Sequence, residues 1–124
     1  MNVKIDTKEK FSVICPEAAD LSANMTEELE QLLIPYLQKD IPHIVFNMEA
    51  VTSISVEAAE KIMSIQQRFY EQNSSFVICK LQPPVEKIFE ENEWLEFMNI
   101  TPSESEAWDM VQMEEIEREL LGDG

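Results

Sequence analysis

Two serines, Ser53 and Ser55, stand just before a predicted helix, at a place where a hydroxyl group can do chemistry. Free backbone N–H groups and the positive end of the helix dipole favour an anion there. A phosphate on such a serine would add about −1.5 to −2 charges and could act as a switch. The first residue of the helix is Val56, whose side chain cannot carry phosphate. A charge switch would therefore have to use Ser55 or Ser53, and either serine is more simply a helix cap.

Few other side chains are candidates for catalysis. His43 is the only histidine and follows Pro42 directly before an apolar run, which predicts a surface or strand-edge residue rather than a general base. Cys15 and Cys79 lie in separate apolar runs, so we expect buried free thiols and neither a CxxC pair nor a zinc set. No nucleophile has a base at a suitable spacing. The sequence predicts a protein that is not an enzyme and has no metal or cofactor.

Acidic residues dominate the charge of the chain. Asp and Glu number 25 against 9 Lys and Arg, which gives a formal net charge of −16. Such a surface repels nucleic acid and anionic lipid headgroups and favours a basic protein partner. The alternative is that the charge only keeps the protein dissolved in a crowded cytosol. Two helix-spaced pairs, Glu57 with Glu60 and Glu114 with Arg118, are typical of solvated helix faces.

The length of 124 residues suits one domain, which we expect to span residues 1–124. The only two glycines lie at the extreme C-terminus, which excludes glycine-rich phosphate loops of the Walker and dinucleotide types. The first residues form no apolar signal region, and no apolar run approaches the roughly 20 residues of a membrane span. We therefore expect a cytoplasmic protein that does not insert directly into a membrane.

Hydrophobic periodicity predicts the elements that would position these residues. We expect strands at residues 3–5, 11–15, 44–47, 75–80 and 97–100, and helices at 24–38, 56–72, 83–92 and 102–121. Pro35 should kink or end the first helix near Ile34. Alternating strands and helices favour parallel pairing, whereas the short turn after the first strand requires an antiparallel pair. The predicted fold class is α/β, with a mixed, mostly parallel sheet of four to five strands and four helices.

The last predicted helix has a clear start and two apolar stripes. Thr101 can cap it, Pro102 can occupy its first position, Glu104 can complete a capping box, and Gly122 can end it. Because the stripes are rotated by roughly 140–180° from one another, one straight helix cannot bury both against a single sheet. The second stripe could meet a dimer mate or a partner helix, or it could belong to a frayed tail. The first stripe is Ala107, Trp108 and Val111, and the second is Met113, Ile116 and Leu120.

Several segments resemble the STAS family, the sulfate-transporter and anti-sigma-factor-antagonist domain. The resemblance runs from about residue 3 to residue 111 and implies the STAS fold. It is carried by residues 44–47, the turn through Ile54, residues 76–81, residues 85–88, Trp94, residues 97–100 and residues 103–107.

The family's signature, Asp-Ser-Ser/Thr-Gly at the start of the second helix, is lost in this chain. By position, Ser55 replaces the aspartate, Val56 the phosphorylated serine, Glu57 the next residue and Ala58 the glycine. Asn47 stands where the third strand of the family commonly ends in aspartate. The resemblance thus implies the scaffold without the usual phosphorylation site.

The resemblance also implies a function. In relatives that resemble anti-sigma-factor antagonists, phosphate on the signature serine blocks docking to the anti-sigma factor, which is also a kinase. We therefore expect a protein–protein interaction module of bacterial partner switching, acting on transcription, whose partner is an anti-sigma factor or serine kinase. The alternative is an accessory subunit of a membrane transport complex, because some STAS domains accompany anion permeases or lipid-transport ATPases.

The expected docking surface surrounds the lost signature, and its use has four readings. It could bind a partner constitutively, Glu57 could mimic a fixed phosphate, Ser55 or Ser53 could be phosphorylated instead, or the loop could serve only as a connection. The residues expected to line the surface are Asn47, Ser53, Ser55, Val56, Glu57 and Ala58.

Overall fold

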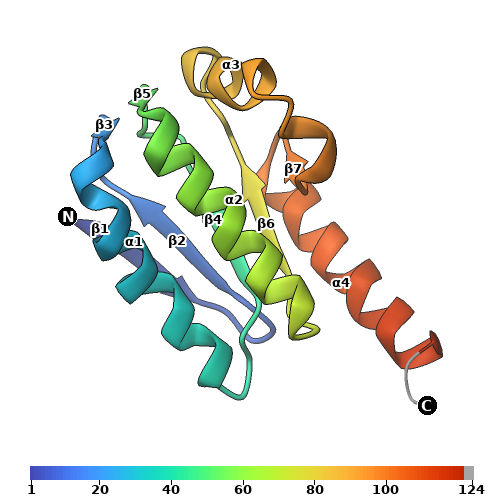
Figure 1. Ribbon diagram of the computed structural model, residues 1–124. Coiled ribbons are helices and arrows are strands. Elements are labelled where there is room, and N and C mark those ends of the chain that lie inside the picture. Colours follow the sequence, from blue (N-terminus) through green and yellow to red (C-terminus); the bar gives the residue numbers. More distant parts are fainter. Residues whose placement is uncertain (122–124) are drawn as a thin grey trace.

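The structure, a computed structural model, describes residues 1–121 and is drawn in Figure 1. Five of its strands form one sheet. Their order is β1-β2-β4-β6-β7. β1 pairs antiparallel with β2, and the three remaining pairings are parallel, which confirms the mixed, mostly parallel sheet expected from the sequence. The strands are β1 (Val3–Thr7), β2 (Ser12–Pro16), β4 (Ile44–Asn47), β6 (Phe76–Cys79) and β7 (Ile100–Thr101).

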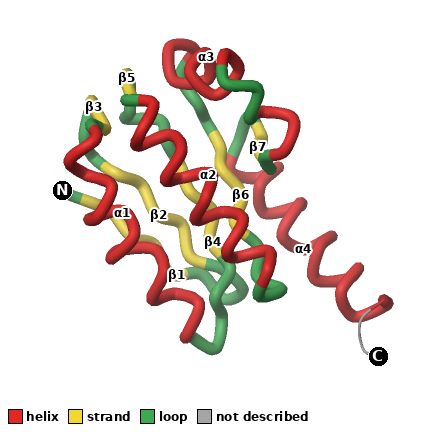
Figure 2. The backbone as a smooth tube through the Cα atoms, in the orientation of Figure 1, coloured by secondary structure: helices red, strands yellow, loops and turns green. Residues whose placement is uncertain are grey.

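Helices cover both faces of this sheet (Figure 2). α1, α2 and α3 pack with one face, and α4 packs on the other. Short 3₁₀ segments at Ala23–Met25, Ile34–Gln38 and Leu95–Phe97 join these elements. The α-helices are α1 (Thr26–Leu33), α2 (Val56–Glu71), α3 (Pro83–Glu91) and α4 (Glu104–Leu121).

The larger core lies between the sheet and α1 to α3. Its centre is aromatic: the ring centroid of Phe76 lies 5.6 Å from that of Phe46 and 5.1 Å from that of Phe69. β4 and β6 are buried along their whole lengths because helices cover both of their faces. The buried face of α2 includes Ala58, Ile62, Ile65 and Phe69, at the spacing of three and four residues that is typical of an amphipathic helix.

A smaller core lies on the opposite face, under α4. Val45 and Val77 of the sheet meet Ala107 and Val111 of the helix, and all four side chains are buried. At the margin of this core, Trp108 stacks on Phe11 with ring centroids 4.5 Å apart. Only the first stripe of the last helix is therefore covered by the sheet.

Proline and cap chemistry fix the helix ends, partly as predicted. α1 gives way to a 3₁₀ segment at Ile34, where Pro35 was expected to end it. The cap predicted at Thr101 is wrong, because Thr101 belongs to β7 and donates its hydroxyl to the Ser103 carbonyl at 2.9 Å. The Oγ of Ser103 accepts the Glu106 backbone N–H at 3.2 Å instead, so Pro102 lies outside the helix. The end predicted at Gly122 lies outside the described residues.

Strand predictions were wrong at two places. Residues 97–100 do not form one strand, because Leu95–Phe97 is a 3₁₀ segment and only Ile100–Thr101 pairs with β6. A second, two-stranded sheet was missed: β3 (Asp20–Leu21) pairs parallel with β5 (Ser53–Ile54). This small sheet stands beside the first turn of α2 and positions the residues that precede it (Figure 1).

Candidate functional site

Ser55 caps α2 and Val56 is its first residue, as the sequence predicts. Ser55 has an extended backbone, and its Oγ accepts the Ala58 backbone N–H at 3.0 Å, which makes it the N-cap. Val56 is the first helical residue, and 46% of its surface is exposed. Glu57 follows, also exposed, in the first turn, where a negative charge suits the helix dipole.

Hydrogen bonds to the β3–β5 sheet and to the residue before it fix the loop that precedes α2. Ser53 donates its hydroxyl to Asp20 Oδ1 at 2.7 Å. The backbone N–H groups of Thr52 and Ser53 both donate to the Ala19 carbonyl, at 2.8 and 3.0 Å, and the Ser55 N–H donates to the Leu21 carbonyl at 2.9 Å. Because so many backbone groups are paired, the start of α2 is held as a preformed surface.

Two residues expected to line the docking surface are buried. Ala58 is fully buried because it faces the core from the first turn of α2. Asn47 is only 5% exposed: its Nδ2 donates to Glu104 Oε2 at 2.7 Å, and its Oδ1 accepts the Glu49 N–H at 2.9 Å. Asn47 thereby joins the end of β4 to the start of α4. The accessible candidates are Ser53, Ser55, Val56 and Glu57.

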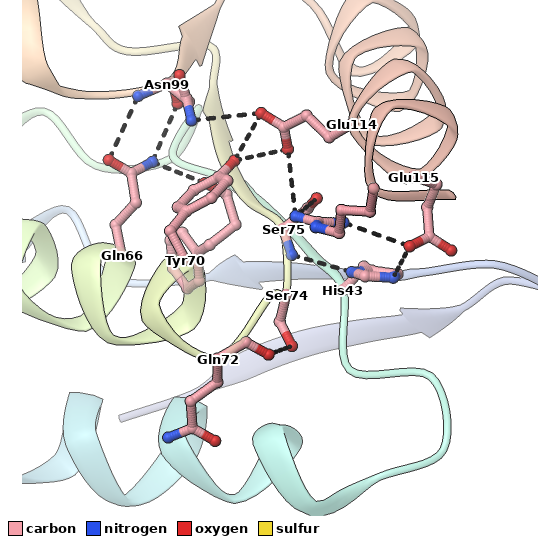
Figure 3. Close-up of polar contacts among 11 residues, drawn as sticks. His43, Gln66, Tyr70, Gln72, Ser74, Ser75, Asn99, Glu114 and Glu115 are labelled. Carbon is pink, nitrogen blue, oxygen red and sulfur yellow. Dashed lines mark hydrogen bonds and ion pairs between the residues drawn. The ribbon is translucent and has the colours of Figure 1, made fainter. Parts of the chain in front are cut away.

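A polar cluster that the sequence analysis missed lies where α4 crosses the amino end of β6 (Figure 3). Arg118 donates to Ser75 Oγ at 2.8 Å and to Glu115 Oε1 at 3.3 Å. Glu114 accepts the Tyr70 hydroxyl at 2.8 Å. Burial, and after it the Glu114 carboxylate, raises the pKa of Tyr70, which keeps this hydroxyl protonated as a donor. The solvated face predicted for Glu114 and Arg118 is therefore wrong, since both side chains are half-buried in contacts.

His43 is also part of this cluster. Of the surface or strand-edge position predicted for it, the surface position is wrong, because His43 is buried directly before β4. Its Nδ1 accepts the Ser75 backbone N–H at 2.9 Å, so the ring proton must sit on Nε2, which lies 3.1 Å from Glu115 Oε1. Burial lowers the pKa of His43, while the neighbouring Glu115 carboxylate acts in the opposite direction. Protonation of Nδ1 would break the bond to Ser75.

Acid should therefore destabilise the fold through His43. A histidine whose pKa is lower in the folded than in the unfolded chain binds more protons when unfolded. Its contribution to the free energy of unfolding is complete above about pH 6.5, the ordinary histidine pKa, and decreases as the pH falls from there toward the lower folded pKa. Urea unfolding of the wild type and His43→Gln between about pH 5 and 8 measures it. The stability difference between the two proteins should shrink with acidification, and a constant difference would contradict the placement of His43.

Burial disfavours the thiolate form of both cysteines. Burial raises the pKa of Cys79 to about 12 and raises the pKa of Cys15 as well. Cys79 is buried as predicted, whereas Cys15 is half-buried, because only one face of β2 is fully covered at that position.

Among residues 1–121, no group of three or more His, Cys, Asp and Glu side chains could hold a metal ion. Within the same residues, every helix is too short or too polar to cross a bilayer.

Comparison with known proteins agrees with this fold. A model of the STAS domain matches residues 2–107. A Thermotoga maritima protein named as an anti-sigma factor antagonist has a TM-score of 0.80 at 16% identity, over 89% of this chain and 94% of its own. The unphosphorylated anti-sigma factor antagonist SpoIIAA of Bacillus has a TM-score of 0.70 at 16% identity, over 90% of this chain and 96% of its own.

A transporter shares the same fold over part of its length. The murine anion transporter Slc26a9 has a TM-score of 0.69 at 12% identity, over 84% of this chain and 18% of the transporter. At such identities, the solved structures agree in fold alone. The family model, in contrast, covers most of the sequence, which confirms the predicted resemblance: the chain belongs to the STAS domain family.

Proposed function

We propose that this chain is a non-catalytic protein-binding module that acts as an anti-sigma-factor antagonist in bacterial, cytoplasmic partner switching. Its docking surface consists of Ser53, Ser55, Val56 and Glu57 at the start of α2. Its partner is an anti-sigma factor of the serine-kinase type. Similarity to proteins named as anti-sigma factor antagonists supports this choice of partner class.

The exposed Val56 is the observation that carries the proposal. It occupies the first helical position and is 46% exposed, so a docked partner can contact an apolar side chain where relatives would carry a phosphorylated serine. A phosphate at a helix start would stand next to free N–H groups. Val56 keeps this place permanently uncharged. We infer constitutive binding, in which the surface holds its partner without a switch at residue 56.

The two nearby serines are engaged in the folded loop. Ser55 Oγ caps the helix and Ser53 Oγ is bonded to Asp20, so phosphate on either would have to replace a local hydrogen bond. Phosphate on Ser53 would also stand beside the Asp20 carboxylate. Glu57 suits the helix dipole without a phosphate-mimicking role. These contacts favour constitutive binding over the readings that use Ser53, Ser55 or Glu57 as the charge switch.

A transport role is the second candidate. The likeness to a segment of Slc26a9 supports it, because that protein is an anion transporter with a domain of this fold. In this role the chain would dock as an accessory subunit on a membrane transport complex. Pull-down with the immobilised chain separates the candidates: a serine kinase of the anti-sigma type is expected, and recovery of a transport ATPase instead would favour the second.

The recovered kinase then tests residue 56 directly. With ATP, the wild type should gain no phosphate at residue 56 and little on Ser55, whereas Val56→Ser should be phosphorylated, as located by mass spectrometry. Val56→Glu should weaken kinase binding by about tenfold or more, because it places a charge in an apolar contact. Ile41→Glu is the matched control, because Ile41 is 43% exposed. It precedes the amino end of β4, whereas α2 follows the carboxyl end, so the Ile41→Glu variant should bind the kinase as the wild type does. Stoichiometric label on wild-type Ser55, or equal binding by Val56→Glu, would overturn the proposal.

A further inference from the structure

The outward face of α4 exposes large apolar side chains. Met113 is 61% exposed, Ile116 55% and Leu120 78%. Their spacing of three and then four residues places them on one side of the helix. Leu121, also exposed, extends the patch at the last described turn. Half of the large exposed hydrophobic side chains of residues 1–121 therefore belong to this single helix.

The opposite face of the same helix is fixed to the sheet. Ala107 and Val111 are buried in the smaller core, and farther along the helix Arg118 donates a hydrogen bond to Ser75. Glu115 contacts His43 (Figure 3). The helix therefore cannot roll to bury its second stripe against its own sheet. The apolar face that we call the outer stripe, Met113, Ile116 and Leu120, is held in a fixed orientation.

A hollow borders the outer stripe. It has a volume of about 260 Å³ and lies between α4 and the turn that joins β1 to β2. Ile116 belongs to both the stripe and the hollow, so the apolar surface continues from the helix into a concave site. Side chains lining the hollow include Lys10, Trp108, Gln112, Glu115, Ile116 and Glu119.

Acidic side chains surround the outer stripe. Glu106, Asp109, Glu117 and Glu119 are all exposed on α4, and none of them forms an ion pair with another residue of the described chain. At about 100° per residue, Glu119 flanks the stripe on one side and Glu117 on the other. A second copy of this chain carries the same acidic side chains and a net charge of −16, so the two copies would repel each other. An anionic membrane would also be repelled. The negative charge around the outer stripe therefore favours a basic binding partner.

We propose that the outer stripe of α4 binds a basic amphipathic helix of a partner protein. Two turns of an apolar helix face cover the rise of about 10 Å from Met113 to Leu120. Lysine or arginine beside that face pairs with Glu117 and Glu119. Such pairs give orientation and fast association, and the apolar contact supplies most of the affinity.

This surface is separate from the docking surface at the start of α2. α2 packs on one face of the sheet and α4 on the other (Figure 1). A helix bound to the outer stripe leaves Val56 uncovered. The chain can therefore join two partners at once, which goes beyond the proposed function.

A designed peptide tests the outer stripe. The probe is a fluorescent helix of about five turns with a leucine stripe flanked by lysines, and the comparison peptide has glutamate in place of each lysine. Fluorescence anisotropy should show binding of the lysine peptide and none of the glutamate peptide. The double variant Ile116→Ser, Leu120→Ser should bind the lysine peptide at least about tenfold more weakly, because it removes two aliphatic contacts. Glu117→Gln with Glu119→Gln should weaken binding and reduce its dependence on salt.

The control is Ile41→Ser, which removes an exposed aliphatic side chain that is not on α4 and does not line the hollow, and it should bind the peptide as the wild type does. Circular dichroism checks that all variants keep the fold. Unchanged binding by the Ile116 and Leu120 variant would overturn the proposal, because it would mean diffuse attraction to an acidic surface. So would wild-type self-association in sedimentation that this variant abolishes, because the occupant would then be a second copy.

Discussion

Phe76→Ala should lower the free energy of unfolding by about 3–5 kcal/mol. Phe76 is fully buried and packs against Phe46 and against the edge of the Phe69 ring, so truncation removes contacts between β6, β4 and α2 together. The cavity would lie at the centre of the larger core, where helices on both sides limit collapse. Urea or guanidinium unfolding measures the change.

Phe97→Ala is the matched control for this core. Phe97 is 70% exposed in a 3₁₀ segment, so its truncation should change stability by no more than about 0.5 kcal/mol. A loss below about 1 kcal/mol for Phe76→Ala, or equal losses for the two variants, would contradict the packing described for the larger core.

Val111→Asp should cost about 3–5 kcal/mol, the usual result of leaving a charge uncompensated in a core. Val111 is 1% exposed and packs among the apolar side chains of Val45, Val77 and Ala107. The effect tests whether α4 is an integral layer of the fold. Because the buried carboxyl group would have a raised pKa, part of the loss should be recovered near pH 4 relative to pH 7.

Met113→Asp provides the control on the same helix. Met113 is 61% exposed on the opposite side of α4, so its replacement should change stability by about 0.5 kcal/mol or less. Thermal unfolding of both variants at pH 7 is the measurement. Similar destabilisation by the two would mean that the outer stripe is packed within the monomer, against the arrangement seen in the structure.

The fold could be predicted where many residues carry the same signal. The apolar stripe of α2 repeats over about three turns. β6 and all of β4 except Asn47 form continuous apolar runs. Two-residue strands have no such repetition, so β3 and β5 gave no signal. At α4 the cap predicted from Thr101 and Glu104 fails because Thr101 pairs in β7, a tertiary contact that local sequence rules do not include, and Ser103 caps the helix instead.

The sequence predicted which residues stand at the start of α2 but not which of their side chains are exposed. Local rules place Ser55 as a cap and Val56 at the helix start. The burial of Ala58 and Asn47 depends on the core below and on Glu104, which lies 57 residues from Asn47. The cluster around His43 brings together residues from a loop, α2, the start of β6 and α4. Spacing along the chain carries no information on such contacts.

The two outermost strands of the main sheet have a consequence for how copies of this protein behave when crowded. β1 is largely exposed and carries Lys4 and Asp6, and β7 has only two residues. Open strand margins otherwise recruit further chains by backbone pairing, the first step toward fibrils. The charged side chains of β1 and the shortness of β7 leave few backbone groups to which a further strand could pair. We therefore expect this fold to resist amyloid-like aggregation.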